Sequence, residues 1–166
     1  MISSRSVGGT WLLDQLWQKL GIRTAITRRL RDRGFRAPVE RALFAMVANR
    51  ALEPSSKLAV EDWVARSVVV PDLPAFNVQH GYRAMDFLLE SEESIQHEVF
   101  QAVASLLNLE VDVLFFDTTS TYFETEESDE DTFRRQGFSK DHRPDLPQAV
   151  IGFAVTREGI PIRCWV

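Results

Sequence analysis

The sequence has little of the chemistry that marks secreted, zinc-binding or membrane proteins. It holds one cysteine, Cys164, and three histidines, so an internal disulfide framework and a cysteine-based zinc knuckle are both excluded. No run of about 18 apolar residues exists to span a bilayer, and the first ten residues lack the apolar core of a signal peptide. We therefore expect a soluble cytoplasmic protein with no membrane partner.

The composition that is present is ordinary for a globular chain. Its 166 residues are 45% hydrophobic and 26% charged, which suits one soluble domain or a small helical module joined to part of another. That length is enough to bury a substantial core.

Charge is distributed unevenly along the chain. The net charge of -5 would argue against nucleic acid if it were uniform. Residues 1–57, however, hold eleven Lys and Arg against four acids, a surplus of +7, which leaves -12 for the remainder. This asymmetry suggests a basic segment facing nucleic acid and an acidic region with another role. The alternative is that both are only solvated faces.

Helical patterns dominate the first two thirds of the chain. Apolar residues at helical spacing, with breaks at glycine and proline, predict four helices, over Thr10–Leu20 (with Thr10 as its N-cap), Ile22–Arg33, Pro38–Leu52 and from Ser55 or Ser56 to about Ala65. Residues 68–81 are predicted to form a connector. Helical character resumes over Tyr82–Leu89, and Ser91 is predicted to begin a further helix that reaches Asn108.

The pattern changes to strand after residue 108. Residues 111–117 are short, apolar and β-branched or aromatic, which predicts a buried strand ending at Asp117. A hairpin is predicted from Gln148–Thr156 and Ile160–Val166, with its turn at Thr156–Gly159. The fold class is therefore α+β. A final strand without a helix to cover the sheet is expected of an interrupted domain.

Asp117 is the residue with the clearest chemical potential. A carboxylate followed by four hydroxyl residues can offer oxygen ligands to a hard divalent cation. Local chemistry alone favours the other interpretation, in which Asp117 ends the strand and caps a turn through Thr118–Ser120.

Longer motifs resemble those of insertion-sequence DDE transposases of the insertion-sequence-four type. The resemblance is carried by Phe116-Asp-Thr-Thr-Ser-Thr-Tyr-Phe-Glu124, by Gly137–Gln148 and by the hairpin segment Val150–Arg163. Upstream, Gly9–Asp14 and Ala42–Lys57 are similar to the helical N-terminal region of that group. Nearly the whole chain is covered.

The resemblance implies a helical N-terminal region over residues 1–108, for DNA binding or oligomerisation, followed at 109–166 by the first strands of an RNase-H-like catalytic domain. It implies that Asp117 is both catalytic and metal-binding, as the first of three acids that hold two Mg²⁺ (or Mn²⁺) ions for DNA strand cleavage and transfer. The second Asp and the final Glu of the family lie beyond the hairpin. We therefore expect a fragment that is inactive alone and does not hold the metals stably.

The partners implied are double-stranded DNA at the inverted repeats of an element and a second subunit in a homodimer, with association with the nucleoid and no small-molecule substrate. The best candidates for DNA contact are the basic residues of two segments, Arg23, Arg28, Arg29, Arg31, Arg33 and Arg36 in the first and Lys140, His142 and Arg143 in the second. The acidic run Glu124–Asp131 is expected to be solvated and is given no role.

Two other functions stay open. One is a DNA-binding remnant or regulator of transposition that lacks catalysis. The other is a helical module for protein interaction, in which the arginines are only solvated.

Overall fold

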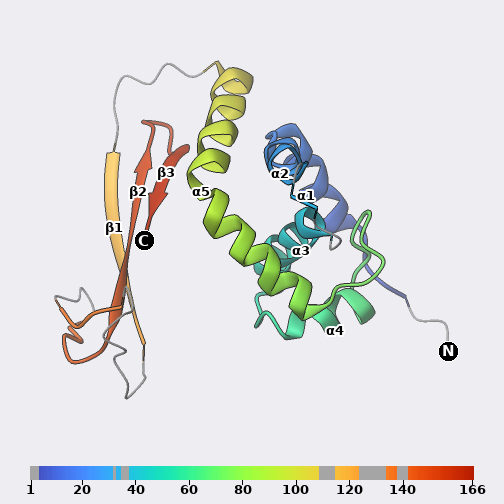
Figure 1. Ribbon diagram of the computed structural model, residues 1–166, viewed down its shortest axis with the longest axis horizontal. Helices are drawn as coiled ribbons and strands as arrows, with labels where there is room; N and C mark the ends of the chain where they lie inside the picture. The colour runs from blue at the N-terminus through green and yellow to red at the C-terminus, as the bar shows by residue number, and fades with distance from the viewer. Residues whose placement is uncertain (1–3, 32, 35–37, 109–114, 124–133, 138–141) are drawn as a thin grey trace. The chain divides into compact units, whose positions relative to one another are not determined.

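The computed structural model describes residues 4–31, 33, 34, 38–108, 115–123, 134–137 and 142–166. The chain divides into two compact units, Met1–Leu107 and Asn108–Val166. The first is helical and the second holds a three-stranded antiparallel sheet (Figure 1). The α+β class is confirmed at this level. None of the helices in the described residues is long and apolar enough to cross a membrane.

The helical unit consists of α1 (Gly8–Lys19), α2 (Ile22–Leu30), α3 (Val39–Leu52), α4 (Ala59–Arg66) and α5 (Val78–Leu107). Helix α3 lies at its centre and contacts each of the other four. Ten of its fourteen residues are buried, seven of them apolar and three polar or charged, Glu40, Arg41 and Asn49. Ala42, Ala45 and Ala48 are fully buried, and such small side chains let neighbouring helices approach closely.

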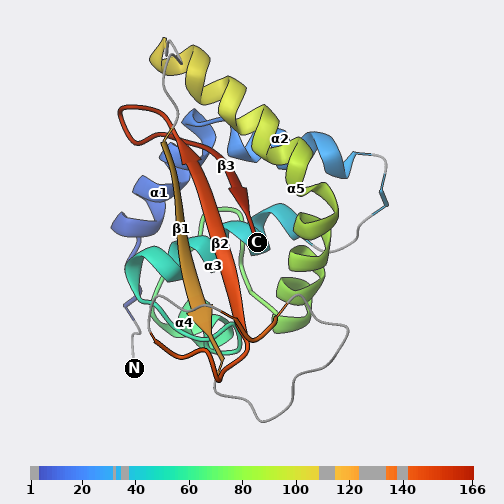
Figure 2. The ribbon, with the colours of Figure 1, turned by 90° about the vertical axis from the view of Figure 1, so that its left-hand side faces the viewer.

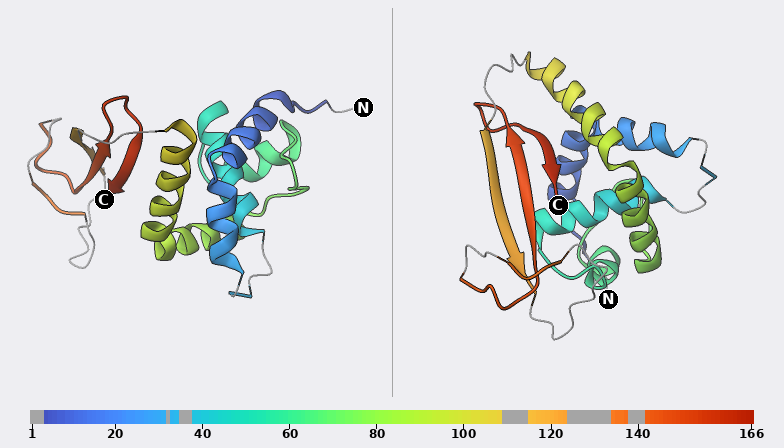
Figure 3. Two further views of the ribbon diagram at one scale, coloured as in Figure 1. Left: turned by 90° about the horizontal axis from the view of Figure 1, so that it is seen from above. Right: turned by 60° about the vertical axis from the view of Figure 1, so that its left-hand side comes forward.

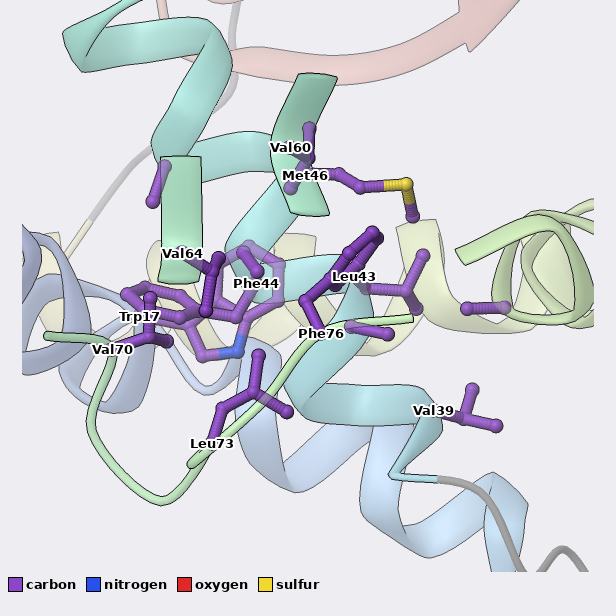
Figure 4. Packing of buried hydrophobic residues seen from close by; sticks show 14 of the residues in the cluster. Trp17, Val39, Leu43, Phe44, Met46, Val60, Val64, Val70, Leu73 and Phe76 are labelled. Atoms are coloured by element: carbon purple, nitrogen blue, oxygen red, sulfur yellow. The ribbon is translucent and has the colours of Figure 1, made fainter. Parts of the chain in front are cut away.

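Aromatic and branched residues fill the space around α3 (Figure 4). Trp17 of α1 meets Phe44 of α3 edge to face, with ring centroids 5.6 Å apart. The same cluster includes residues from α4 and from the segment 67–77, Val60, Val64, Val70, Leu73 and Phe76. This single cluster fixes how α1 and α4 lie against α3.

Helix α2 is joined to α1 by a turn that only glycine fits. Gly21 has φ of 75°, a left-handed conformation that costs other residues about 1–2 kcal/mol. A Cβ atom on Gly21 would also lie 2.8 Å from the Cβ of Ala102 on α5. Helices α2 and α5 therefore approach each other closely at Gly21 and Ala102 and lie side by side (Figure 3).

Several predicted helix starts are wrong. Helix α4 begins at Ala59, with Leu58 and not Ser55 or Ser56 at its N-cap, and α5 begins at Val78, inside the predicted connector 68–81. Helix α1 begins at Gly8, so Thr10 is inside it, where its buried hydroxyl donates to the carbonyl oxygen of Val69 at 2.6 Å and lies 3.0 Å from that of Val7. Ser91 does not begin a helix either, because α5 runs unbroken from Val78 to Leu107. Its buried residues Gly81, Ala84, Phe87, Ser91 and Ile95 form one continuous stripe.

The sheet has the order β1-β2-β3, with β2 in the centre (Figure 2). It consists of β1 (Phe115–Tyr122), β2 (Gln148–Val155) and β3 (Pro161–Trp165). The predicted hairpin is confirmed: Gly159 has φ of 81° in the turn, and its N–H donates to the Thr156 carbonyl at 3.0 Å. The acidic run 124–131 lies outside the described residues.

Candidate functional site

Asp117 lies within β1 and not at its end. The strand continues for five residues to Tyr122, and Asp117 pairs directly with Phe153 of β2. The prediction that the strand ends at Asp117 is therefore wrong. The prediction of a central buried strand is also wrong, because β1 is an edge strand of the described sheet and most of its residues are exposed. A turn through Thr118–Ser120 is also wrong, because those residues pair in register with 150–152.

The surroundings of Asp117 are polar on its own strand and apolar across from it. Side chains alternate along a strand, so Asp117, Thr119 and Thr121 share one face of the sheet. The carboxylate is exposed, and its Oδ1 accepts the N–H of Thr118 at 2.8 Å. Three oxygen-bearing side chains thus follow one another along an accessible face.

A magnesium ion would find one suitable ligand in Asp117. Exposed carboxylate oxygens are what Mg²⁺ prefers, and two-metal chemistry needs several of them. Among the described residues, no three His, Cys, Asp or Glu side chains come together. Within the described part of the chain, Asp117 could therefore act as one ligand of a metal site, and the further carboxylates that two-metal chemistry requires are not placed beside it.

The second basic segment is only partly described. Lys140 lies outside the described residues. His142 is exposed with φ of 59°, and Arg143 forms two hydrogen bonds to Asp145, at 3.0 and 2.9 Å. These bonds hold the pKa of the Asp145 carboxyl below its usual value. The positive charge of Arg143 is thus balanced within its own loop.

Arginines of the first basic segment also have carboxylate partners. Arg28 and Arg29 share Glu98 of α5, at 3.1 and 2.7 Å, and Arg33 pairs with Glu90 at 2.5 Å. Arg23 donates to Asp72 at 2.8 Å, which lowers the pKa of that exposed carboxyl. Arg31 is exposed, and Arg36 lies outside the described residues.

The charge of the helical unit is consequently much smaller than that of its first 57 residues. The unit holds thirteen Lys and Arg and twelve acids, a net charge of +1, and the sheet unit has -6. Eight of those twelve acids follow residue 57, and three of them, Asp72, Glu90 and Glu98, contact the arginines directly. The basic segment is therefore largely neutralised by its own unit.

Comparisons with known proteins leave the identity open. No protein-family model, curated protein or solved structure matches the chain. Function must therefore be proposed from the motifs and from the geometry.

A buried ionic network in the helical unit is a feature that the sequence reasoning missed. Arg41 of α3 donates to Asp14 of α1 at 2.6 Å and to both oxygens of Glu40, at 2.5 and 2.6 Å. Glu40 also accepts the indole N–H of Trp17 at 2.7 Å. Arg41, Asp14 and Glu40 are each at least 90% buried in their side chains.

Arg41 stays charged despite its burial. Loss of hydration acts to lower the pKa of Arg41, but the hydrogen bonds to Glu40 and Asp14 and the attraction of their negative charges together raise it. Arg41 also donates to the backbone carbonyl of Pro71 at 3.3 Å and lies 4.6 Å from the centre of the Phe44 ring. The network thus ties α1 and α3 to the segment 67–77, which is a structural role.

Proposed function

We propose that this chain is part of a DDE-type transposase, in which the helical unit binds double-stranded DNA and the sheet unit carries the first metal-binding carboxylate, Asp117. The observation that carries the proposal is the position of Asp117. It is an exposed acid on the first strand of an antiparallel three-stranded sheet, and it comes directly after a helical unit with arginines along α2. This arrangement agrees with the order of parts that the motifs imply.

The DNA-binding part of the proposal is supported by exposure and type of side chain. The side chains of Arg28, Arg29 and Arg33 are 41–61% exposed, and the fork of a guanidinium group matches the oxygens of a phosphate. Their pairs with Glu90 and Glu98 are open to solvent at least on the arginine side, and exposed ion pairs are worth about 0–1 kcal/mol. Phosphate can therefore exchange with these carboxylates at small cost.

We expect the full chain to bind duplex DNA at low salt, and the triple variant Arg28→Ala, Arg29→Ala, Arg33→Ala to bind about 10- to 100-fold more weakly. Each lost phosphate contact should also reduce the slope of log affinity against log salt by about 0.9. Fluorescence anisotropy with a labelled duplex over a salt series measures both quantities.

The matched control removes three exposed arginines elsewhere in the helical unit, Arg50→Ala, Arg66→Ala and Arg83→Ala. It changes the net charge equally and should weaken binding much less. Absence of DNA binding by the wild-type chain and by every variant, even at low salt, would refute the DNA-binding function.

We also expect this chain by itself to leave supercoiled DNA intact in the presence of Mg²⁺ or Mn²⁺. One carboxylate supplies too few ligands to hold two metal ions about an in-line displacement. A plasmid-nicking assay measures this. Metal-dependent nicking that is lost in Asp117→Ala would contradict this expectation and show that the chain itself supplies the other metal ligands.

A protein-interaction module is the second candidate, and one surface favours it. Trp11, Leu12 and Leu16 of α1 are 45–56% exposed and lie along one side of the helix. If this surface binds a protein partner or a second copy of the chain, the double variant Trp11→Ser, Leu12→Ser should abolish that association without changing DNA affinity.

A further inference from the structure

The arginines proposed to contact DNA are held by two carboxylates of α5. The two oxygens of Glu98 are divided between two arginines: Oε2 contacts Arg28 and Oε1 contacts Arg29. Two turns earlier on α5, Glu90 contacts Arg33. Since α2 contacts α5 directly, these pairs link the arginine-bearing side of one helix to the other.

Glu98 reproduces what a DNA phosphate would offer. Carboxylate and phosphate groups both present negatively charged oxygens that can accept paired hydrogen bonds from a guanidinium group. The Glu98 side chain is only 18% exposed, whereas that of Arg28 is 61% exposed. The acid is thus a fixed part of the surface, and the arginines are the parts that can turn outward.

Space for a phosphate exists next to this pair. A cleft of about 370 Å³ lies between α2 and α5, and Arg28 and Glu98 both line it. Its other polar walls are Thr24 on α2 and His97 and Gln101 on α5. These side chains can donate hydrogen bonds to a phosphate oxygen that enters beside Arg28, so α2 and α5 need not separate.

We propose that Glu90 and Glu98 act as an intramolecular substitute for DNA phosphate, occupying Arg28 and Arg29 of α2 and Arg33 beyond its end, and so limiting the affinity of this surface for duplex DNA. The inference rests on the proposed DNA-binding function and adds its regulation. Binding must break the Arg–Glu pairs, and the freed carboxylates then face the DNA backbone. Both effects oppose binding, and both disappear when the carboxylates are made neutral.

The test compares the full-length wild-type chain with the double variant Glu90→Gln, Glu98→Gln, which keeps shape and removes charge. We expect the double variant to bind a labelled duplex about 3- to 30-fold more tightly at low salt, because up to three exposed pairs no longer compete. Glu92→Gln is the control variant. Glu92 lies on the same helix and accepts a hydrogen bond from Gln96, so its substitution should change affinity less than about twofold.

A double-mutant cycle separates competition for arginine from a general effect of charge. In a chain that already carries Arg28→Ala, Arg29→Ala and Arg33→Ala, the Glu90→Gln and Glu98→Gln changes should give no gain in affinity. A full gain in that background would overturn the inference.

The two proposals fail in different ways. If the wild-type chain binds DNA and loses affinity in the triple arginine variant, but Glu90→Gln with Glu98→Gln gains no more than Glu92→Gln, the competition is refuted and DNA binding stands. If no variant binds DNA, the DNA-binding function fails. Binding by the Glu→Gln variant alone would support both, because it would show complete self-inhibition.

Discussion

Replacing Arg41 with methionine is expected to lower the free energy of unfolding of the helical unit by about 3–5 kcal/mol. Methionine has a similar length and is apolar, so the loss comes from charge and not from a large cavity. Without the guanidinium, Asp14 and Glu40 are two buried carboxylates that no longer have a common cation. Such groups must either be protonated or draw water into the core.

The measurement is denaturant unfolding, monitored by far-ultraviolet circular dichroism. This signal reports on the helical unit, because every helix among the described residues lies in it. Arg50→Met is the matched control on the same helix. Arg50 is exposed, and its substitution should change the free energy of unfolding by less than about 0.5 kcal/mol. Equal stability of Arg41→Met and Arg50→Met would show that the network contributes little.

Replacing Phe44 with alanine is expected to cost about 3–5 kcal/mol in the same experiment. Phe44 is 1% exposed, and its ring lies between the indole of Trp17 and the guanidinium of Arg41. Alanine would leave a cavity at the junction of α1 and α3 and would remove the surface against which Arg41 is held.

Phe44→Leu tests whether volume accounts for that loss. Leucine keeps most of the apolar volume and should cost clearly less than alanine. A loss as large for leucine as for alanine would mean that the ring contacts matter more than packing. A loss below about 1 kcal/mol for alanine would mean that the core rearranges to fill the space.

The helices that the sequence predicted well are those whose limits have a local cause. Proline suits the start of a helix and not its interior, so Pro38 marks where α3 begins. Glu53 precedes Pro54 and is therefore disfavoured in a helix, which ends α3, and the predicted limits are almost those of Val39–Leu52. The helix start predicted at Ser91 was wrong because serine is common at helix N-termini but also occurs inside helices. Here its small side chain is part of a buried stripe that extends from Gly81 to Ile95, and contact with the rest of the unit outweighs the local preference.

The limits of β1 depend on a partner strand that sequence patterns do not supply. Thr118, Thr119 and Ser120 together suggest a turn, but β2 offers eight residues, from Gln148 to Val155, and β1 pairs with every one of them. Thr119, Thr121 and Tyr122 are good strand residues. Asp117 was therefore identified by its motif, whereas its place within the strand could not be predicted.

The ion pairs were beyond sequence reasoning for a similar reason. Arg28 and Glu98 are 70 residues apart in the chain, and Arg41 and Asp14 are 27 apart. One local signal for the network was present. Asp14 lies four residues after Thr10 and three before Trp17, on the side of α1 that is buried, and an acid on a buried face requires a cation.

Gly21 and Ala102 place a constraint on how this sequence can vary. The left-handed backbone keeps position 21 as glycine, and the missing Cβ is what allows the methyl group of Ala102 to lie against it. Position 21 is therefore restricted to glycine and position 102 to a small residue, because a larger residue at 102 would force α2 away from α5. The exposed arginines are under no such steric restriction. Among distant relatives, glycine at 21 with a small residue at 102 should thus persist longer than the charges, and would reveal common descent after the basic residues have diverged.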